Sequence, residues 1–77
     1  MKTRIVDVAV TITSVRFTDG IHGLPTRMEW QGRTVRFCDS GIRVRGRLGH
    51  TITLSDDRAH YCLRHQHGVW RLLSVSS

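Results

Sequence analysis

The stretch TRMEWQGRTVRF, residues 26–37, decides the fold because it has the pattern of a β-hairpin. With Gln31-Gly32 as a two-residue turn, Met28 opposes Val35 across the two strands. One face of the hairpin then collects the apolar side chains Met28, Trp30, Val35 and Phe37, and the other collects Arg27, Glu29, Thr34 and Arg36. A shift of register by one residue would mix these faces. The pattern therefore predicts antiparallel strands joined by a type I′ turn.

The same two-residue alternation continues through the chain, and no stretch has the apolar spacing of a helix. The β-branched residues Val6, Val8, Val10 and Ile12 alternate with Asp7, Ala9, Thr11 and Thr13. A bulge near Ser14 is expected to return Val15 and Phe17 to the core side. Further turns are predicted at Asp19-Gly20, at Asp56-Asp57 and in a four-residue loop, His65-Gln66-His67-Gly68. We expect one all-β domain over residues 1–77, a small antiparallel barrel or sandwich of about six or seven short strands.

Charge is the strongest compositional signal. The 77 residues carry a net charge of +6, and every basic residue except Lys2 is arginine. Such a balance favours acidic partners, nucleic acid first, although a GC-rich genome also produces arginine-rich chains. No apolar run approaches the roughly 20 residues that span a bilayer, so no membrane partner is expected. The beginning of the chain does not resemble a secretory signal, which favours a cytoplasmic protein with Cys38 and Cys62 as thiols.

The sequence predicts no enzyme. Its carboxylates fall mostly at expected turns, and His60 and Cys62, two apart on one strand face, lack a third group to orient them. A metal site built from His60, Cys62, His65 and His67 is disfavoured because no known zinc-ligand spacing is present. We therefore expect no catalytic residue, no cofactor and no metal.

The candidate binding residues are five arginines: Arg27, Arg36, Arg43, Arg45 and Arg47. In an extended segment the last three project from one face, which we expect to be the outer face, with Ile42 and Val44 alternating between them. Arg27 and Arg36 are predicted to oppose each other, and like charges so placed cost stability unless Glu29, which lies diagonally from Arg36, or a bound anion relieves them.

These observations lead to two hypotheses of function. The first is a non-catalytic β module that binds nucleic acid weakly, as an accessory in DNA repair or elsewhere. Because the aromatic residues fall on expected core faces, such contact is salt-sensitive and largely independent of sequence. The second is a protein-interaction module, homodimeric through an edge strand, since the long apolar strand over 5–12 would otherwise need to be central or covered. A strand face that is merely solvated explains the arginines equally well.

Short motifs of the chain resemble a family of small all-β domains of unknown function that is common in actinobacteria. The matching residues are Pro25, Met28, Trp30, Gly32, Arg33, Gly68, Trp70 and Leu72. Some members of this family occur beside error-prone DNA polymerase-related proteins, so the resemblance implies an all-β fold and a setting in DNA repair. The segment RVRGRLGHTITL, residues 43–54, departs from the family pattern, which puts a shared partner surface in doubt.

Overall fold

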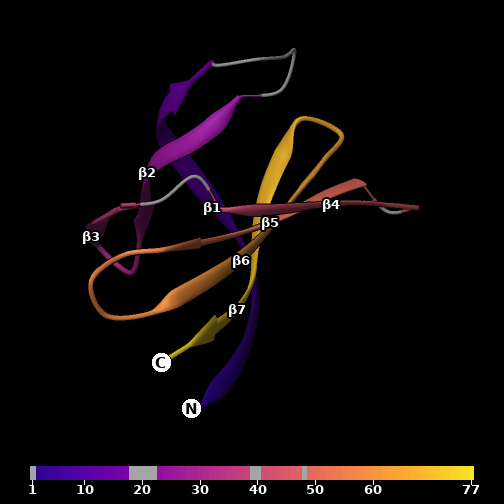
Figure 1. The fold of residues 1–77 in the computed structure, drawn as a ribbon. Coiled ribbons are helices and arrows are strands. Elements are labelled where there is room, and N and C mark those ends of the chain that lie inside the picture. Colours follow the sequence, from indigo (N-terminus) through magenta and orange to yellow (C-terminus); the bar gives the residue numbers. More distant parts are fainter. Residues whose placement is uncertain (1, 18–22, 39–40, 48) are drawn as a thin grey trace.

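A computed structural model describes residues 2–17, 23–38, 41–47 and 49–77. It contains seven strands, which are β1 (Thr3–Arg16), β2 (Leu24–Trp30), β3 (Arg33–Arg36), β4 (Ile42–Gly46), β5 (Gly49–Ser55), β6 (His60–Gln66) and β7 (Val69–Ser76) (Figure 1). They form one antiparallel sheet in the order β3-β2-β1-β7-β6-β5-β4. Nowhere in the described ranges is there a helix with the length and hydrophobicity needed to cross a membrane.

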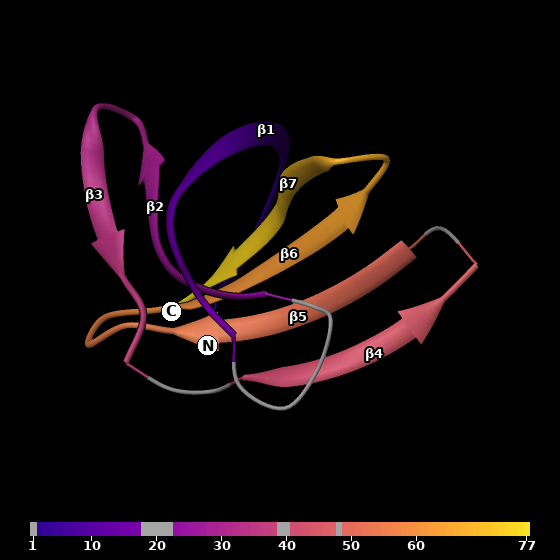
Figure 2. The ribbon, with the colours of Figure 1, turned by 90° about the horizontal axis from the view of Figure 1, so that it is seen from above.

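The expected all-β antiparallel class is confirmed, and the seven strands form a single sheet that is not closed into a barrel. The β2–β3 hairpin lies at one side of the molecule and β4 at the other (Figure 2). The chain that follows β3 is hydrogen-bonded to the end of β5, because the Cys38 N–H donates to the Ser55 carbonyl at 2.8 Å. We call the face of the sheet that carries the core the inner face, and the opposite face the outer face.

The β2–β3 hairpin has the predicted register, with Met28 opposite Val35 and Trp30 opposite Arg33. Gln31 and Gly32 have φ angles of 53° and 72°, so both turn positions are left-handed, as a type I′ turn requires. A glycine tolerates this conformation at the second position without strain. The prediction of strand, turn and register is confirmed for this segment.

Strand β1 is central, which is one of the two arrangements expected for it, because it pairs with two neighbours. Its first part, up to Val10, pairs with β7, and its second part, from Thr11, pairs with β2. The predicted irregularity is present as a register shift on both sides of Ser14. It does not return the following side chains to the core, however, because Val15 and Phe17 remain 39% and 70% exposed. That part of the prediction is wrong.

The turns predicted for two hairpins would set Leu54 opposite Ala59 and Leu63 opposite Trp70, and the observed registers differ from these by two residues. In the β6–β7 hairpin this holds from Leu63 to the turn, because a register shift lies between Cys62 and Leu63. Leu54 lies opposite Tyr61 in the β5–β6 hairpin, and Leu63 lies opposite Leu72 in the β6–β7 hairpin. The second of these closes through a two-residue turn, His67-Gly68, in place of the expected four-residue loop. Shifts by two preserve the inner and outer faces, so the alternation of side chains is the same in both registers.

Asp56 explains why the β5–β6 turn forms where it does. Its Oδ1 accepts the backbone N–H groups of Arg58 and Ala59 at 2.8 and 2.9 Å, and its Oδ2 accepts the hydroxyl of Tyr61 at 3.0 Å. Burial by itself would raise the pKa of Asp56, but these three hydrogen bonds and the positive charge of Arg33 outweigh it and hold the pKa below its ordinary value. Asp56 thus begins the turn that was expected to be centred on Asp56-Asp57.

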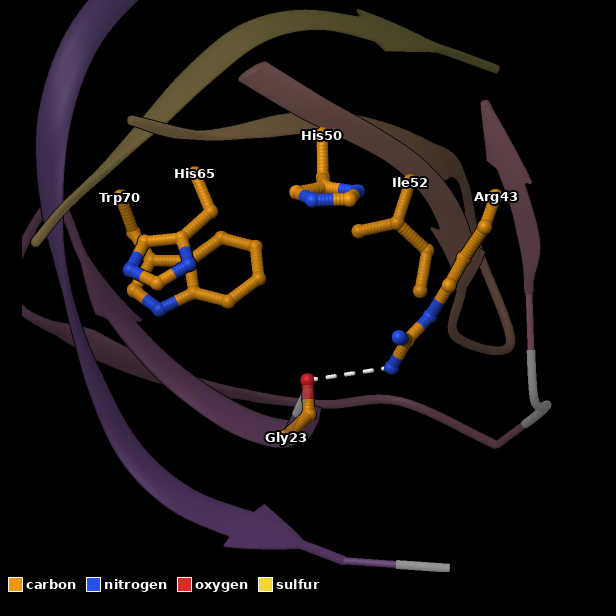
Figure 3. Close-up of a pocket in the computed structure, with 6 residues that line it drawn as sticks. All are labelled: Gly23, Arg43, His50, Ile52, His65 and Trp70. Carbon is orange, nitrogen blue, oxygen red and sulfur yellow. Dashed lines mark hydrogen bonds between the residues drawn. The ribbon is translucent and has the colours of Figure 1, made fainter. Parts of the chain in front are cut away.

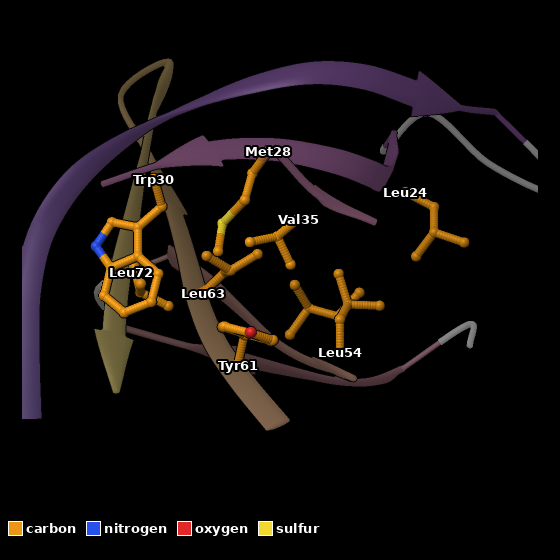
Figure 4. Packing of buried hydrophobic residues seen from close by; sticks show 9 residues of the cluster. Leu24, Met28, Trp30, Val35, Leu54, Tyr61, Leu63 and Leu72 are labelled. Carbon is orange, nitrogen blue, oxygen red and sulfur yellow. The ribbon is translucent and has the colours of Figure 1, made fainter. Parts of the chain in front are cut away.

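The core lies between the β2–β3 hairpin and the inner faces of β5, β6 and β7 (Figure 4). Tyr61 is its largest fully buried side chain, and its ring meets Trp30 edge-on at 6.3 Å and Phe37 at 5.7 Å. Such aromatic pairs stabilise a core beyond the area that they bury. The remaining buried apolar residues are Leu24, Met28, Val35, Ile52, Leu54, Leu63 and Leu72. The predicted turn at Asp19-Gly20 lies outside the described residues.

Candidate nucleic-acid interface

Arg27 and Arg36 lie on the outer face of the β2–β3 hairpin, directly opposite each other. Both are exposed, while Met28 and Val35, their neighbours along the strands, are buried. The predicted juxtaposition of two guanidinium groups on the outer face is therefore confirmed. Glu29 lies on the same face, where it accepts a long hydrogen bond of 3.5 Å from the Thr34 hydroxyl.

Strand β4 has the opposite orientation from the one expected. Arg43 lies opposite Ile52, a core residue, and Arg45 lies opposite His50, so both arginines belong to the inner face. Ile42 and Val44 belong to the outer face, where they are 73% and 59% exposed. The prediction that Arg43 and Arg45 share an outer surface with Arg27 and Arg36 is wrong, because the pairing of β4 with β5 places them on the other side of the sheet.

Arg43 reaches across a small cleft on the inner face. Its Nη2 donates to the carbonyl oxygen of Gly23, just before β2, at 3.1 Å (Figure 3). The wall of the cleft includes His65, whose imidazole stacks on the indole of Trp70 with ring centres 4.4 Å apart and planes within 8°. The rest of the cleft is formed by Arg43, His50, Ile52 and Gly23.

A second pair of arginines, which the sequence did not reveal, lies on the outer face. Arg64 of β6 is directly opposite Arg71 of β7. Arg71 is held by Asp7, because its Nε donates to Oδ1 and its Nη2 to the backbone carbonyl of that residue, both at 2.9 Å. Asp7 has a φ of 50° at the irregularity between Ile5 and Val8, so the guanidinium fixes a strained position of β1.

Arg47 lies at the β4–β5 turn and shares an outer groove with Arg64. Thr51, which pairs with Arg64 across the strands, lines the same groove together with Gly46 and Gly49. The five predicted arginines are thus divided three ways: two on the outer hairpin face, two on the inner face of β4, and Arg47 beside the newly found pair. We use the name outer arginine pairs for Arg27–Arg36 and Arg64–Arg71.

Few carboxylates balance these charges. Within the part of the chain that the structure describes, Asp7 forms an ion pair with Arg71, whereas Arg27, Arg36 and Arg64 form none. Asp56 is engaged by the β5–β6 turn. The outer face therefore holds guanidinium groups beside one another with little local compensation, an arrangement that an anion stabilises.

The residues considered for catalysis or metal binding are separated by the sheet. His60 and Cys62 belong to the outer face, His65 belongs to the inner face, and His67 is exposed in the β6–β7 turn. No group of three or more His, Cys, Asp or Glu side chains that could hold a metal ion occurs among the described residues. Cys38 and Cys62 are both free thiols.

No family model, no curated protein and no solved structure matches this chain. The resemblance to the actinobacterial domains thus stays a prediction. Several of the residues that carry it, such as Met28, Trp30 and Leu72, are buried, and Gly32 and Gly68 form turns. They describe how this chain folds rather than what it binds.

Proposed function

We propose that this chain is a non-catalytic β module that contacts the phosphate backbone of nucleic acid through its outer arginine pairs. One observation carries the proposal: two cross-strand couples of arginines, Arg27–Arg36 and Arg64–Arg71, occupy the outer face of one sheet. Directly opposed like charges cost stability in a sheet, so each pair is explained by a phosphate that lies against it. The sheet bends around the core, which places the outer sides of the β2–β3 hairpin and of β6 and β7 on opposite sides of the molecule, so each pair meets a different stretch of the polyanion. The formal net charge of +6 supports the same partner at longer range.

The binding that we propose is electrostatic and does not depend on base sequence. Stacking on exposed aromatic side chains is the usual way to hold single-stranded bases. Trp30 and Tyr61 are buried in the core, and Trp70 is covered by His65 on the inner face. Phe17, which is 70% exposed at the end of β1, is the one large exposed aromatic in the described ranges. Phosphate contacts therefore dominate the interaction.

Salt dependence tests the proposal. Fluorescence anisotropy with a short labelled single-stranded oligodeoxynucleotide measures affinity as the salt concentration rises. A short oligonucleotide meets one pair at a time, so about two phosphates are neutralised at Arg27–Arg36, and affinity falls about sevenfold between roughly 50 and 200 mM salt. Replacing Arg27 by glutamine lowers affinity and reduces the slope of log affinity against log salt by about 0.7.

Arg45→Gln is the matched control, because it removes the same charge from the inner face of β4. It leaves both affinity and slope close to those of the unmodified chain. The proposal fails if the unmodified chain does not bind the oligonucleotide at low salt. It also fails if Arg45→Gln has the same effect as Arg27→Gln, since net charge rather than position would then explain the binding.

A further inference from the structure

Strand β4 ends the sheet with an edge that has an unusual distribution of side chains. It pairs with β5 alone, and in the described ranges no strand lies along its other side. Edge strands are normally protected by polar side chains, because their unpaired N–H and C=O groups attract other strands. Here the outer face of the edge presents Ile42 and Val44, which are 73% and 59% exposed, while the inner face presents Arg43 and Arg45.

The other edge of the sheet is different. Strand β3 has only four residues, and its exposed side chains are Arg33, Thr34 and Arg36. The chain that follows it is bound to β5, since Cys38 donates both its N–H and its thiol to the Ser55 carbonyl, at 2.8 and 3.3 Å. Of the two edges, β4 is the one suited to accept another strand.

We infer that β4 binds an extended segment of another protein in which carboxylate and apolar side chains alternate. A strand added beside β4 continues the sheet, so its side chains alternate between the same two faces. Those on the inner face lie beside Arg45 and beside Arg43, whose guanidinium also donates to the Gly23 carbonyl, and the positive charge of both favours Asp or Glu. Those on the outer face meet Ile42 and Val44, which favour valine or isoleucine.

A second copy of this chain does not fit the same edge. Two-fold antiparallel pairing of β4 with β4, with inner faces continuous, sets residues of the inner face opposite each other. Whether the axis passes through Arg43, Val44 or Arg45, an arginine then opposes an arginine. Like charges in direct opposition are unfavourable, so the inner arginines protect the edge against self-association while they admit an acidic strand.

The inner cleft extends this charge preference beyond the edge itself. Arg43 lines the cleft with His50 and His65, and no carboxylate is among its described lining residues (Figure 3). Arg45, His50, His65 and Trp70 follow one another across four neighbouring strands. Acidic side chains of an added strand therefore enter surroundings that are basic and apolar.

Binding of two synthetic peptides tests the inference on the full chain. In one peptide valine alternates with glutamate, and in the other valine alternates with lysine. We expect the glutamate peptide to bind at least about tenfold more tightly, given two favourable cross-strand charge pairs in place of two unfavourable ones. Amide hydrogen exchange should slow within residues 42–46 and not along β3.

Arg45→Glu is expected to weaken the glutamate peptide about tenfold and to strengthen the lysine peptide. Arg64→Glu, on the outer face, is the matched control and leaves peptide binding unchanged while it weakens the oligonucleotide. The inference is overturned if the glutamate peptide does not bind, if both peptides bind equally, or if protection appears away from β4. Because the peptide and the oligonucleotide respond to different arginines, failure of one proposal is distinguished from failure of the other.

Discussion

Replacing Asp56 by alanine is expected to destabilise the fold more than its position in a turn suggests. The substitution removes the acceptor for two backbone N–H groups, those of Arg58 and Ala59, and for the hydroxyl of Tyr61. The Arg58 N–H is exposed and regains a bond to water, so its loss costs little. The Tyr61 hydroxyl belongs to a residue that is only 1% exposed, and it loses its partner with less access to water.

These contributions sum to about 2–3 kcal/mol of unfolding free energy, after allowance for the partial exposure of the turn. A domain of this length has a total stability of about 4–12 kcal/mol, so the loss is a substantial fraction of the whole. Chemical denaturation followed by tryptophan fluorescence measures it, since Trp30 contacts Tyr61 in the core.

Asp57→Ala is the matched control, because Asp57 is the next residue in the turn and is exposed. It should change stability by less than about 0.5 kcal/mol. Tyr61→Phe should cost about 1 kcal/mol and should make the effect of Asp56→Ala smaller in the double variant. Equal losses for Asp56→Ala and Asp57→Ala would refute the assignment of the turn.

Three further predictions concern pH, backbone conformation and charge. The pKa of Asp56 is held below its ordinary value of 3.8, so the ionised carboxylate stabilises the fold fully above that pH. This stabilisation is lost as the pH falls through the lower pKa of the folded state. In acid titrations followed by circular dichroism, Asp56→Asn should lack this pH-dependent loss of stability. Gly49→Ala should lower the free energy of unfolding by about 2 kcal/mol in urea denaturation, because Gly49 has a φ of 117° and an added Cβ would lie 2.5 Å from the His65 carbonyl oxygen. At Gly46 an added Cβ would have no neighbour nearer than 3.7 Å, so Gly46→Ala should cost less than half as much. Arg36→Gln should raise stability by a few tenths of a kcal/mol in low salt and by less in high salt, since it relieves the opposition of Arg27; a loss of stability in low salt would count against that opposition.

The sequence indicated which face of the sheet each side chain occupies better than it indicated which residues pair across neighbouring strands. The β2–β3 hairpin was predicted in full because Gln31-Gly32 fixes its turn and one register separates the apolar side chains from the charged ones. In the β5–β6 and β6–β7 hairpins, by contrast, a displacement by two residues leaves every side chain on the same face. The choice there depended on the bonds of Asp56 and on the left-handed φ of His67, which alternation does not encode.

The same ambiguity of register concealed the second outer arginine pair, Arg64–Arg71, which is half of the candidate site. The predicted register separated Arg64 from Arg71, so the second outer pair could not be found, although recognition of His67-Gly68 as a two-residue turn would have revealed it. Strand β4 posed a different problem, because Ile42 and Val44 alternate perfectly with Arg43 and Arg45. At an edge strand, burial of the apolar set is not obligatory, and the pairing with Ile52 decides which set faces inward.

The most direct test of the proposed interface is an NMR titration of the isotopically labelled chain with an oligonucleotide at low salt. The side-chain Nε–Hε signals of Arg27, Arg36 and Arg64 are predicted to shift together as the oligonucleotide is added, and those of Arg43 and Arg45 are predicted to stay in place. Shifts confined to Arg43 and Arg45, or no shift in any of the five, would contradict the assignment of the outer face to nucleic acid.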